Sequence, residues 1–163
     1  HPEKYFANET AIEVEPRPLE DTLGDEWEFL ISETLGELVT GMVLGSSANY
    51  LIQLDPITAA EAATGWGGDS YQVFYRARSN QSILVVHWVW DSIAEGDEFN
   101  QALGEYLNRR YVGRKIEAFD TDCWTKINDH FSCMFTNGNE SLWLLAPGLD
   151  DIENLLEHYP EFK

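Results

Sequence analysis

The sequence has little positive charge, with 10 Lys and Arg against 29 Asp and Glu, and its formal net charge is −19. A surface this negative repels phosphate, which excludes a nucleic-acid binder and disfavours docking on anionic lipid. Since no run of about 18 apolar residues occurs either, we expect no membrane span. The partner that we expect is a protein.

Complete catalytic motifs are also absent. The sequence contains no G-x-S-x-G, no HExxH, no C-x-x-C and no EF-hand loop, so we do not expect this chain alone to be an enzyme. Two acidic groups, Asp120-x-Asp122 and Asp150-Asp151-x-Glu153, lack the spacing and central glycine of a calcium loop. Solvated loops and a helix N-terminus account for them. We expect no cofactor, with surface-bound calcium as the one alternative left open.

Cysteine is scarce, and its two positions, Cys123 and Cys133, suggest a bridge. A zinc site formed with His130 would lack a fourth ligand. If strands at Cys123–Ile127 and Phe131–Thr136 form a hairpin that turns about Asn128, Cys123 lies directly opposite Cys133, near the separation that a disulfide requires. The sequence therefore predicts a Cys123–Cys133 disulfide.

This prediction depends on the register of the hairpin. A two-residue turn at Asp129-His130 would place Cys123 opposite Thr136, and two buried free thiols are the alternative. A disulfide indicates an oxidising compartment, so we expect an extracytoplasmic protein, secreted or on the cell surface. Glycosylation sequons at Asn8, Asn80 and Asn139 are too few to decide the compartment.

The chain divides into an arm at residues 1–24 and a single domain at residues 25–163. Pro2, Pro16 and Pro18, without a helical period, predict an extended strap that lies over the domain or reaches a neighbour. Assembly through this proline-rich arm is one way in which the chain could join other proteins.

Periodicity and capping boxes predict an α+β domain. Helices are expected behind Thr34-x-x-Glu37, Thr58-x-x-Glu61 and Ser92-x-x-Glu95, and a closing helix runs from Asp150 or Asp151 toward His158. The expected strands are 26–31, 71–78, 82–91, 123–127, 131–136 and 141–146. We therefore expect an antiparallel sheet of about five to six strands in hairpins, with helices packed on one face.

The most distinctive segment is Gly65-Trp66-Gly67-Gly68-Asp69. It can be interpreted as a ligand loop, in which the glycines allow close approach and Trp66 offers a flat apolar surface. The interpretation that we favour is a helix C-cap and a tight turn, with Trp66 folded onto the core. No helix follows, which argues against nucleotide binding. Candidate ligand-binding residues here are Trp66, Gly67, Gly68, Asp69 and Tyr71.

A second cluster, His87-Trp88-Val89-Trp90-Asp91, lies on an expected strand. His87 and Asp91 share one face, but strand residues four apart are separated by about 13 Å, too far for a catalytic pair. A partly buried histidine and a strand-end aspartate are the better interpretation. His87, Trp90 and Asp91 complete the set of candidate ligand-binding residues.

Four segments, HPEKYF (1–6), TLGEL (34–38), AAEAATGWGGDSYQVFYR (59–76) and WDSIAEGDEF (90–99), form an ordered set. This set resembles the C-terminal region of uncharacterised extracytoplasmic metallopeptidase-like proteins of Chloroflexus-like bacteria and haloarchaea. In longer members, a segment ending in His-Pro-Glu-Lys-Tyr follows an HExxH domain. Since this sequence holds no HExxH, zinc ligands and a general base are not carried over, and the resemblance implies an accessory domain.

Three functions follow as hypotheses. The first is a non-catalytic extracytoplasmic module that binds or assembles, as the C-terminal part of a peptidase-like precursor. The second is a hydrolase, or a regulator of one, with its site near Trp66, Asp69 and His87. The third is a structural subunit of a cell-surface assembly. A cleft that holds Asp69 beside His87 would favour the second hypothesis.

Overall fold

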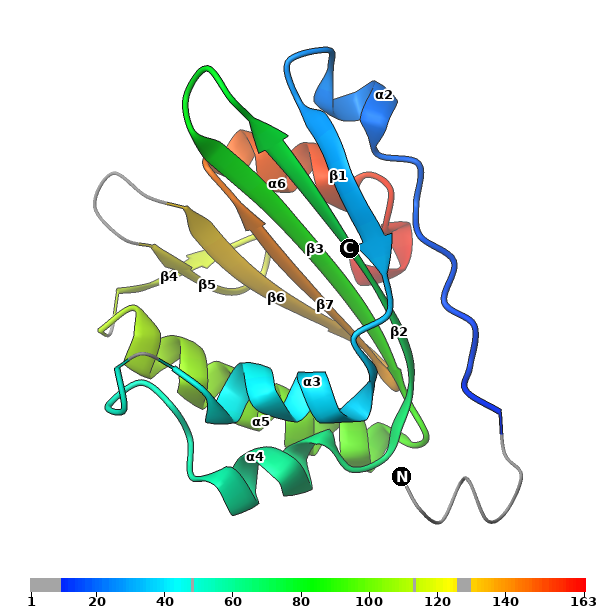
Figure 1. Cartoon of the computed structure of the whole chain (residues 1–163), viewed down its shortest axis with the longest axis vertical. Helices are drawn as coiled ribbons and strands as arrows, with labels where there is room; N and C mark the ends of the chain where they lie inside the picture. The colour runs from blue at the N-terminus through cyan, green and yellow to red at the C-terminus, as the bar shows by residue number, and fades with distance from the viewer. Residues whose placement is uncertain (1–9, 48, 113, 126–129) are drawn as a thin grey trace.

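A seven-stranded antiparallel sheet is the framework of the computed structural model, which describes residues 10–47, 49–112, 114–125 and 130–163 (Figure 1). The order across the sheet is β1-β2-β3-β7-β6-β5-β4. The strands are β1 Glu28–Glu33, β2 Trp66–Arg76, β3 Gln81–Trp90, β4 Lys115–Ala118, β5 Thr121–Thr125, β6 Phe131–Asn137 and β7 Glu140–Ala146. The α+β class and the hairpins are confirmed, and β4 raises the strand count above the expected five to six.

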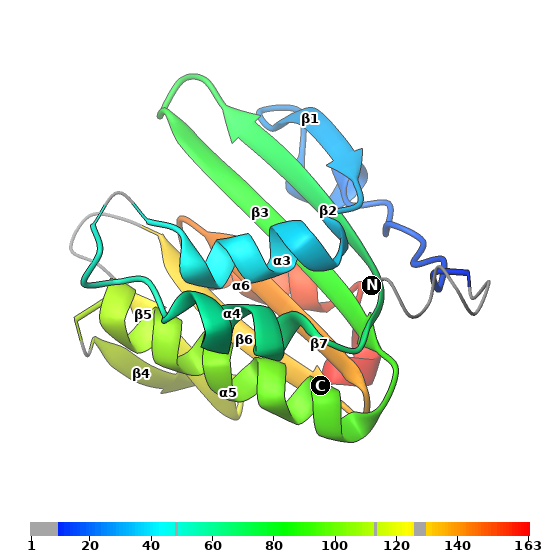
Figure 2. The same cartoon turned by 60° about the horizontal axis from the view of Figure 1, so that its bottom comes forward.

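Helices cover both faces of the sheet, which corrects the expectation of helices on one face (Figures 1 and 2). Helices α3, α4 and α5 lie on one face, whereas α2, α6 and the short 3₁₀ helix η1 lie on the other. Their bounds are α2 Glu20–Leu23, α3 Gly36–Gly45, α4 Pro56–Ala63, α5 Ile93–Arg110, α6 Leu149–Leu156 and η1 Pro160–Phe162. No helix in these ranges has the length and apolar character needed to cross a membrane.

Tryptophans dominate the core under α3, α4 and α5. Alternation along the strands brings four indoles to this face, all at most 6% exposed, and each indole N–H donates to a side-chain oxygen. A satisfied N–H allows such a large ring to be buried without an unpaired donor. The pairs are Trp88 with Thr40 (3.0 Å), Trp90 with Ser141 (3.0 Å), Trp124 with Asn108 (2.8 Å) and Trp143 with Ser132 (2.7 Å).

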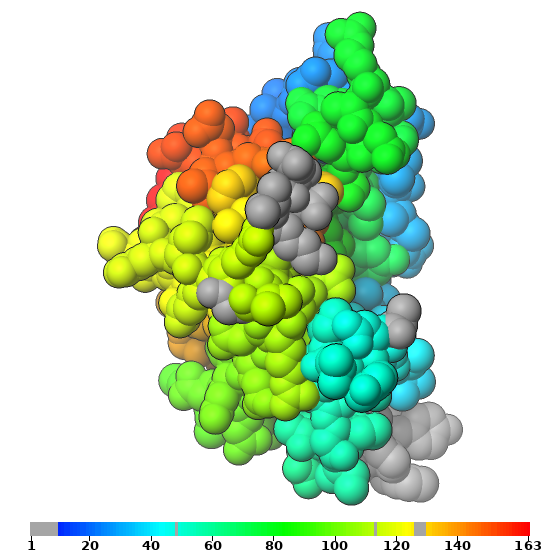
Figure 3. Space-filling view, turned by 90° about the vertical axis from the view of Figure 1, so that its left-hand side faces the viewer, coloured from blue at the N-terminus to red at the C-terminus, as the bar shows by residue number. Residues whose placement is uncertain are grey.

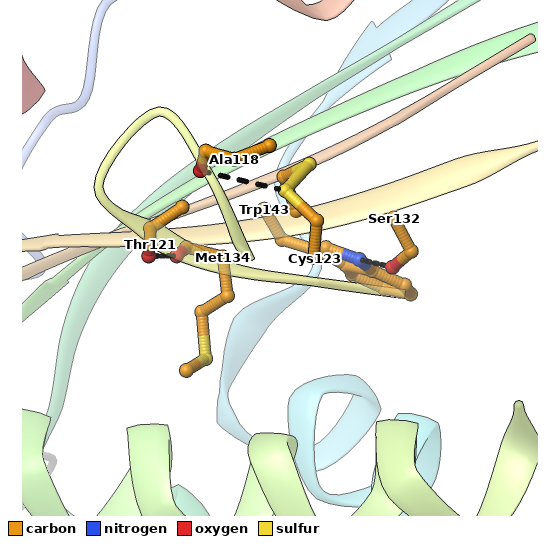
Figure 4. Close-up of a disulfide and its surroundings, with 7 residues drawn as sticks. Ala118, Thr121, Cys123, Ser132, Met134 and Trp143 are labelled. Atoms are coloured by element: carbon orange, nitrogen blue, oxygen red, sulfur yellow. Dashed lines mark hydrogen bonds between the residues drawn. A yellow bond between two sulfur atoms is a disulfide. The ribbon is translucent and has the colours of Figure 1, made fainter. Parts of the chain in front are cut away.

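The opposite core contains the disulfide. Cys123 on β5 faces Cys133 on β6 in the predicted register, their sulfurs are bonded, and both residues are fully buried (Figure 4). The predicted disulfide is confirmed. The turn that was expected about Asn128 lies outside the described residues. Helix α6 covers this core with Ile152, Leu155 and Leu156.

Two of the three capping boxes do not form. Ser92 does cap α5, since its Oγ accepts the Glu95 N–H and donates to the Glu95 carboxylate. Helix α4 begins earlier than predicted, because Asp55 accepts the backbone N–H groups of Ile57 and Thr58 and Pro56 occupies the first turn. Helix α3 has no cap from a neighbouring side chain. The carboxylate of Asp69 on β2 accepts the backbone N–H groups at its N-terminus.

The described part of the arm crosses its own domain as a strap (Figure 1). Leu19 is fully buried in the core under α6, and the carbonyl of Arg17 accepts a hydrogen bond from Gln72 at 3.0 Å. The Arg17 guanidinium donates to Glu161 at 2.8 Å and lies over the ring of Tyr159. Burial raises the pKa of the Tyr159 hydroxyl. The arm is not extended throughout, because α2 forms at its end.

Candidate functional site

The Gly65–Asp69 segment is the start of a strand, so the prediction of a tight turn there is wrong. Gly65 does follow the C-cap of α4 with a positive φ of 79°, as predicted for that position. Beyond it, Trp66 opposes Trp90 and Gly68 opposes Val89, which leaves Gly67 as the extra residue of a β-bulge. The segment is therefore the bulged start of β2.

Gly67 and Gly68 make room for the arm. The backbone N–H of Ile12 donates to the carbonyl of Gly67 at 2.8 Å. A Cβ at Gly68 would lie 2.0 Å from the Ile12 carbonyl oxygen, a backbone atom that has no easy way to move. The close approach that the sequence attributed to a ligand is made by residue 12 of the same chain.

Asp69 holds the N-terminus of α3. Its carboxylate accepts the backbone N–H groups of Leu35 (2.7 Å) and Gly36 (2.8 Å), and also the indole N–H of Trp66 (2.7 Å). The side chain is 3% exposed, and a negative charge at a helix N-terminus is electrostatically favourable. Asp69 thus caps a helix that is distant in sequence.

The aromatic candidates in this region pack against the core under α3, α4 and α5. Trp66 and Tyr71 are partly buried against that core, as the interpretation we favoured for Trp66 requires. Trp90 is 0% exposed and gives no platform for a ligand. Asp91 is exposed just beyond β3, and its backbone N–H donates to the Gly65 carbonyl at 2.8 Å.

His87 lies on the opposite face of the sheet from Asp69. It pairs across the ladder with Ser70, whereas Asp69 pairs with Trp88, so the two side chains point away from each other. The His87 Nε2 lies 2.7 Å from a carboxylate oxygen of Glu140, and the ring is 5% exposed. The structure therefore does not bring Asp69 and His87 together, and His87 is a buried, paired histidine.

The acidic groups considered for calcium have partners within the protein. Asp122 forms an ion pair with Lys115 at 2.6 Å, and Asp151 accepts the backbone N–H of Gly148 at 3.1 Å. Burial raises the pKa of the Asp151 carboxyl. Within the described ranges, no three or more His, Cys, Asp or Glu side chains gather where a metal ion could bind.

Two of the three sequons lie in described loops. The Asn80 side chain accepts a hydrogen bond from the Tyr75 hydroxyl in the exposed β2–β3 turn. The Asn139 side-chain amide donates to the Trp90 carbonyl at 2.6 Å. Asn8 lies outside the described residues.

Sequence reasoning missed an exposed apolar surface on α3, on α4 and on the segment that joins them. Of the twelve exposed large apolar residues in the described chain, six belong to this region. We call these six residues the α3–α4 surface: Leu38, Val39, Met42, Tyr50, Leu51 and Ile57. Leu38 is 77% exposed and Met42 51%, and they lie four residues apart on one side of α3.

A groove of about 370 Å³ runs between α3 and α4, which lie side by side (Figure 2). Gly41 and Ala59 let the helices approach, since a Cβ at Gly41 would lie 3.3 Å from the Ala59 carbonyl oxygen. Leu38, Met42 and Pro56 are among the larger residues that line the groove. In Figure 3, α3 and α4 (cyan to teal) adjoin α5 on one continuous side of the molecule.

The sequence did contain a signal for this surface. In α3, Glu37 is the single charged residue among ten, so the helix is apolar on nearly every side. A helix of this composition is normally surrounded by protein. Here one side contacts the domain and the other faces solvent.

Comparison with known proteins identifies a family. A family model described as a domain of unknown function, DUF8575, matches residues 28–156, from the first residue of β1 to the last residue of α6. No curated protein and no solved structure matches the chain. The chain belongs to the DUF8575 family.

Proposed function

We propose that this chain is a non-catalytic, extracytoplasmic binding module that holds another protein on the α3–α4 surface. The observation that carries this proposal is the group of large apolar side chains that α3 and α4 present to solvent, beside an apolar groove. Contiguous exposed apolar patches on a folded domain typically mark interaction sites.

The candidate ligand-binding residues are engaged in contacts within the chain, which supports a role without catalysis. Asp69 accepts three hydrogen bonds from its own chain, and Gly67 and Gly68 seat the arm. His87 is buried beside Glu140 on the other face. These placements favour the binding module over a hydrolase site near Trp66, Asp69 and His87.

The disulfide supports the extracytoplasmic part of the proposal. Disulfides persist in oxidising compartments, and Cys123–Cys133 accounts for both cysteines of the sequence. The arm offers less support for assembly, because its described residues are bound to their own domain through Ile12, Arg17 and Leu19.

An unbiased displayed-peptide library tests the proposed binding surface. Peptides are selected on the wild-type chain, and their affinities are then measured on the double variant Leu38→Glu, Met42→Glu. Because both changes place charge on the apolar groove, we expect selected peptides to lose about tenfold or more in affinity. The matched control is Ile93→Glu, which alters an equally exposed apolar residue (60%) on α5 and should leave binding unchanged.

Binders that retain their affinity on the double variant would place the preferred surface elsewhere and contradict the proposal. Thermal melting of each variant excludes general unfolding as the cause of any loss. Since Leu38 and Met42 are already exposed to solvent, the substitutions should change the free energy of unfolding by less than about 0.5 kcal/mol.

A further inference from the structure

We infer that a cationic, extended segment of another protein binds in a second groove, between the arm and the end of β1. This groove shares no lining residue with the groove between α3 and α4, so the inference goes beyond the proposed function. It draws on the free edge of β1, on a buried hydroxyl and on three exposed carboxylates.

The second groove has a volume of about 460 Å³ and lies where the arm passes the end of β1 (Figure 1). One wall is formed by residues 11–16 of the arm and the other by residues 32–34, and the start of β2 completes the lining. Its volume is within the range of known ligand sites, about 300–1,000 Å³. The walls therefore leave room for a further chain segment.

The outer edge of β1 is open to another strand. β1 is the last strand of the sheet, and within the described residues it pairs with β2 alone. Phe29, Leu30 and Ile31 are 42%, 52% and 38% exposed. A strand at the edge of a sheet presents N–H and C=O groups that can pair with an extended segment of a partner. We therefore expect the occupant to lie alongside β1 as a strand.

Ser70 gives the groove a polar group that the chain does not use. It lines the groove and is 7% exposed, and its hydroxyl forms no hydrogen bond to any described residue. A buried hydroxyl without a partner costs free energy, which a ligand that supplies a hydrogen bond would recover. The backbone of the bound segment offers both N–H and C=O groups for this hydrogen bond.

Three glutamates determine the charge of the occupant. Glu13, Glu15 and Glu33 line the groove and are exposed, and none forms an ion pair with a described residue. The described lining contains no Lys, Arg or His. Arg17, which follows the lining residues of the arm, is already paired with Glu161. Lys or Arg side chains of a partner would therefore be attracted to these carboxylates.

Two other occupants fit less well. Among the described residues, no three acidic, His or Cys side chains gather closely enough to hold a metal ion, so a single bound cation is not favoured. In a second copy, an antiparallel β1 paired in the centred register would place Glu28 opposite Glu33 at both ends, and like charges directly opposite are destabilising. A basic segment of another protein fits the edge, the hydroxyl and the carboxylates together.

Three synthetic peptides test the inference on the full chain. All have a core of alternating Thr and Val. The first is flanked by Lys on both sides and the second by Gln, and the third is the Lys peptide with N-methyl groups on every core amide. N-methylation keeps the charge and removes the donors that strand pairing requires. By fluorescence anisotropy at about 20 mM salt, we expect the Lys peptide to bind about tenfold more tightly than either of the others.

Charge variants locate the binding site. Glu13→Gln with Glu33→Gln removes one charge from each wall and should bring the Lys peptide to within about twofold of the Gln peptide. The matched control, Glu153→Gln with Glu157→Gln, removes the same two charges from exposed positions in α6 and just after it. The control should retain most of the preference. An unchanged preference in the first double variant would overturn the inference.

Ser70→Ala tests the contribution of the hydroxyl. We expect the Lys and the Gln peptides each to bind several-fold more weakly. The melting temperature of the variant should not fall, because this hydroxyl has no hydrogen-bond partner among the described residues of the free chain. Unchanged affinity for both peptides would contradict the inference.

The remaining outcomes separate this inference from the proposed function. Equal binding of the Lys peptide and its N-methylated form would overturn strand pairing. Failure of all three peptides would overturn the inference and leave the library result at the α3–α4 surface unaffected. Loss of Lys-peptide binding in Leu38→Glu with Met42→Glu alone would assign the peptide to that surface instead. A dimer in analytical ultracentrifugation that Leu30→Lys abolishes would identify a second copy as the occupant and also overturn the inference.

Discussion

Helices α3 and α6 lie over opposite faces of the same sheet, and they differ in what their outer sides carry. In α6, Ile152, Leu155 and Leu156 are all buried, and Asp150 and Glu153 face solvent. In α3, Leu38, Val39 and Met42 are exposed. Because the two helices are of similar length, the contrast lies in composition: α6 buries its large apolar residues, whereas α3 buries Leu44 and leaves others exposed.

The two helices also differ in how they begin. The N-terminus of α6 is satisfied locally, since Asp151 of its first turn accepts the Gly148 N–H. The N-terminus of α3 depends on Asp69 of β2, more than 30 residues away in sequence. The position of the α3–α4 surface is therefore set by tertiary structure.

The largest effect that separates the two helices is expected from Asp69→Ala. The substitution leaves the N–H groups of Leu35, Gly36 and Trp66 without their acceptor, and we expect it to lower the free energy of unfolding by about 3 kcal/mol. Hydrogen exchange should accelerate in α3 and stay unchanged in α6. The control, Asp97→Ala on the exposed side of α5, removes the same charge and should cost less than about 0.5 kcal/mol.

Reduction of the disulfide tests the stability of the core on the α6 side of the sheet. Cys123 and Cys133 are separated by ten residues, a loop for which the stabilisation expected is a little under about 3 kcal/mol. Urea unfolding with and without reductant should differ by that amount, and the core under α6 should loosen before that under α5. Two free thiols in the denatured, unreduced protein would contradict the disulfide and remove the main support for an extracytoplasmic location.

A smaller and local effect is expected from Gly68→Ala. The new Cβ would meet the Ile12 carbonyl oxygen, so residues 10–16 of the arm should lift from β2. Cleavage by a Glu-specific protease after Glu13 should then become faster. The substitution itself should lower the free energy of unfolding by about 1 kcal/mol. Gly104→Ala is the control, since its Cβ meets nothing within 4 Å and it should slightly stabilise α5. Equal cleavage of both variants would mean that Gly68 does not seat the arm.

The smallest expected effect is the salt dependence of the melting temperature, which involves the whole domain. With a net charge of −19, self-repulsion should lower stability when it is not screened. We expect the melting temperature to rise by a few degrees between roughly 10 and 150 mM salt, as the Debye length falls from about 30 to 8 Å. A flat response would indicate that bound cations or internal ion pairs already neutralise the acids.

Local signals predicted the hairpins and the register of the disulfide. Gly138 and Asn139 form the β6–β7 turn beyond the Asn137–Glu140 pair, with Gly138 at a positive φ of 58°, and Cys123 faces Cys133 as the predicted register required. Strand β4 was missed because it has only four residues, two of them charged. An alternation of polar and apolar residues this short cannot be distinguished from a loop. The closing helix was predicted from the sequence, but periodicity cannot say which face of a sheet a helix covers.

The misread positions depend on partners that are distant in sequence. Gly67 and Gly68 were read as a ligand loop or a turn because nothing near them indicates that Ile12 lies above. Asp69 was read as a binding residue because its partners, Leu35 and Gly36, come from another element. The α3–α4 surface was missed because apolar periodicity predicts a helix with a buried side and does not show how much of that helix remains exposed.

The order of the strands has a consequence for how the chain folds. Every neighbouring pair in the sheet joins strands that follow one another in sequence, except β3 and β7. The β3–β7 pairing runs from the Leu84–Leu145 pair to the Val89–Glu140 pair. It brings together strands that are separated in sequence by α5 and three strands. Contacts of such sequence separation form slowly. The two halves can therefore become ordered separately, and folding is completed when β7 pairs with β3.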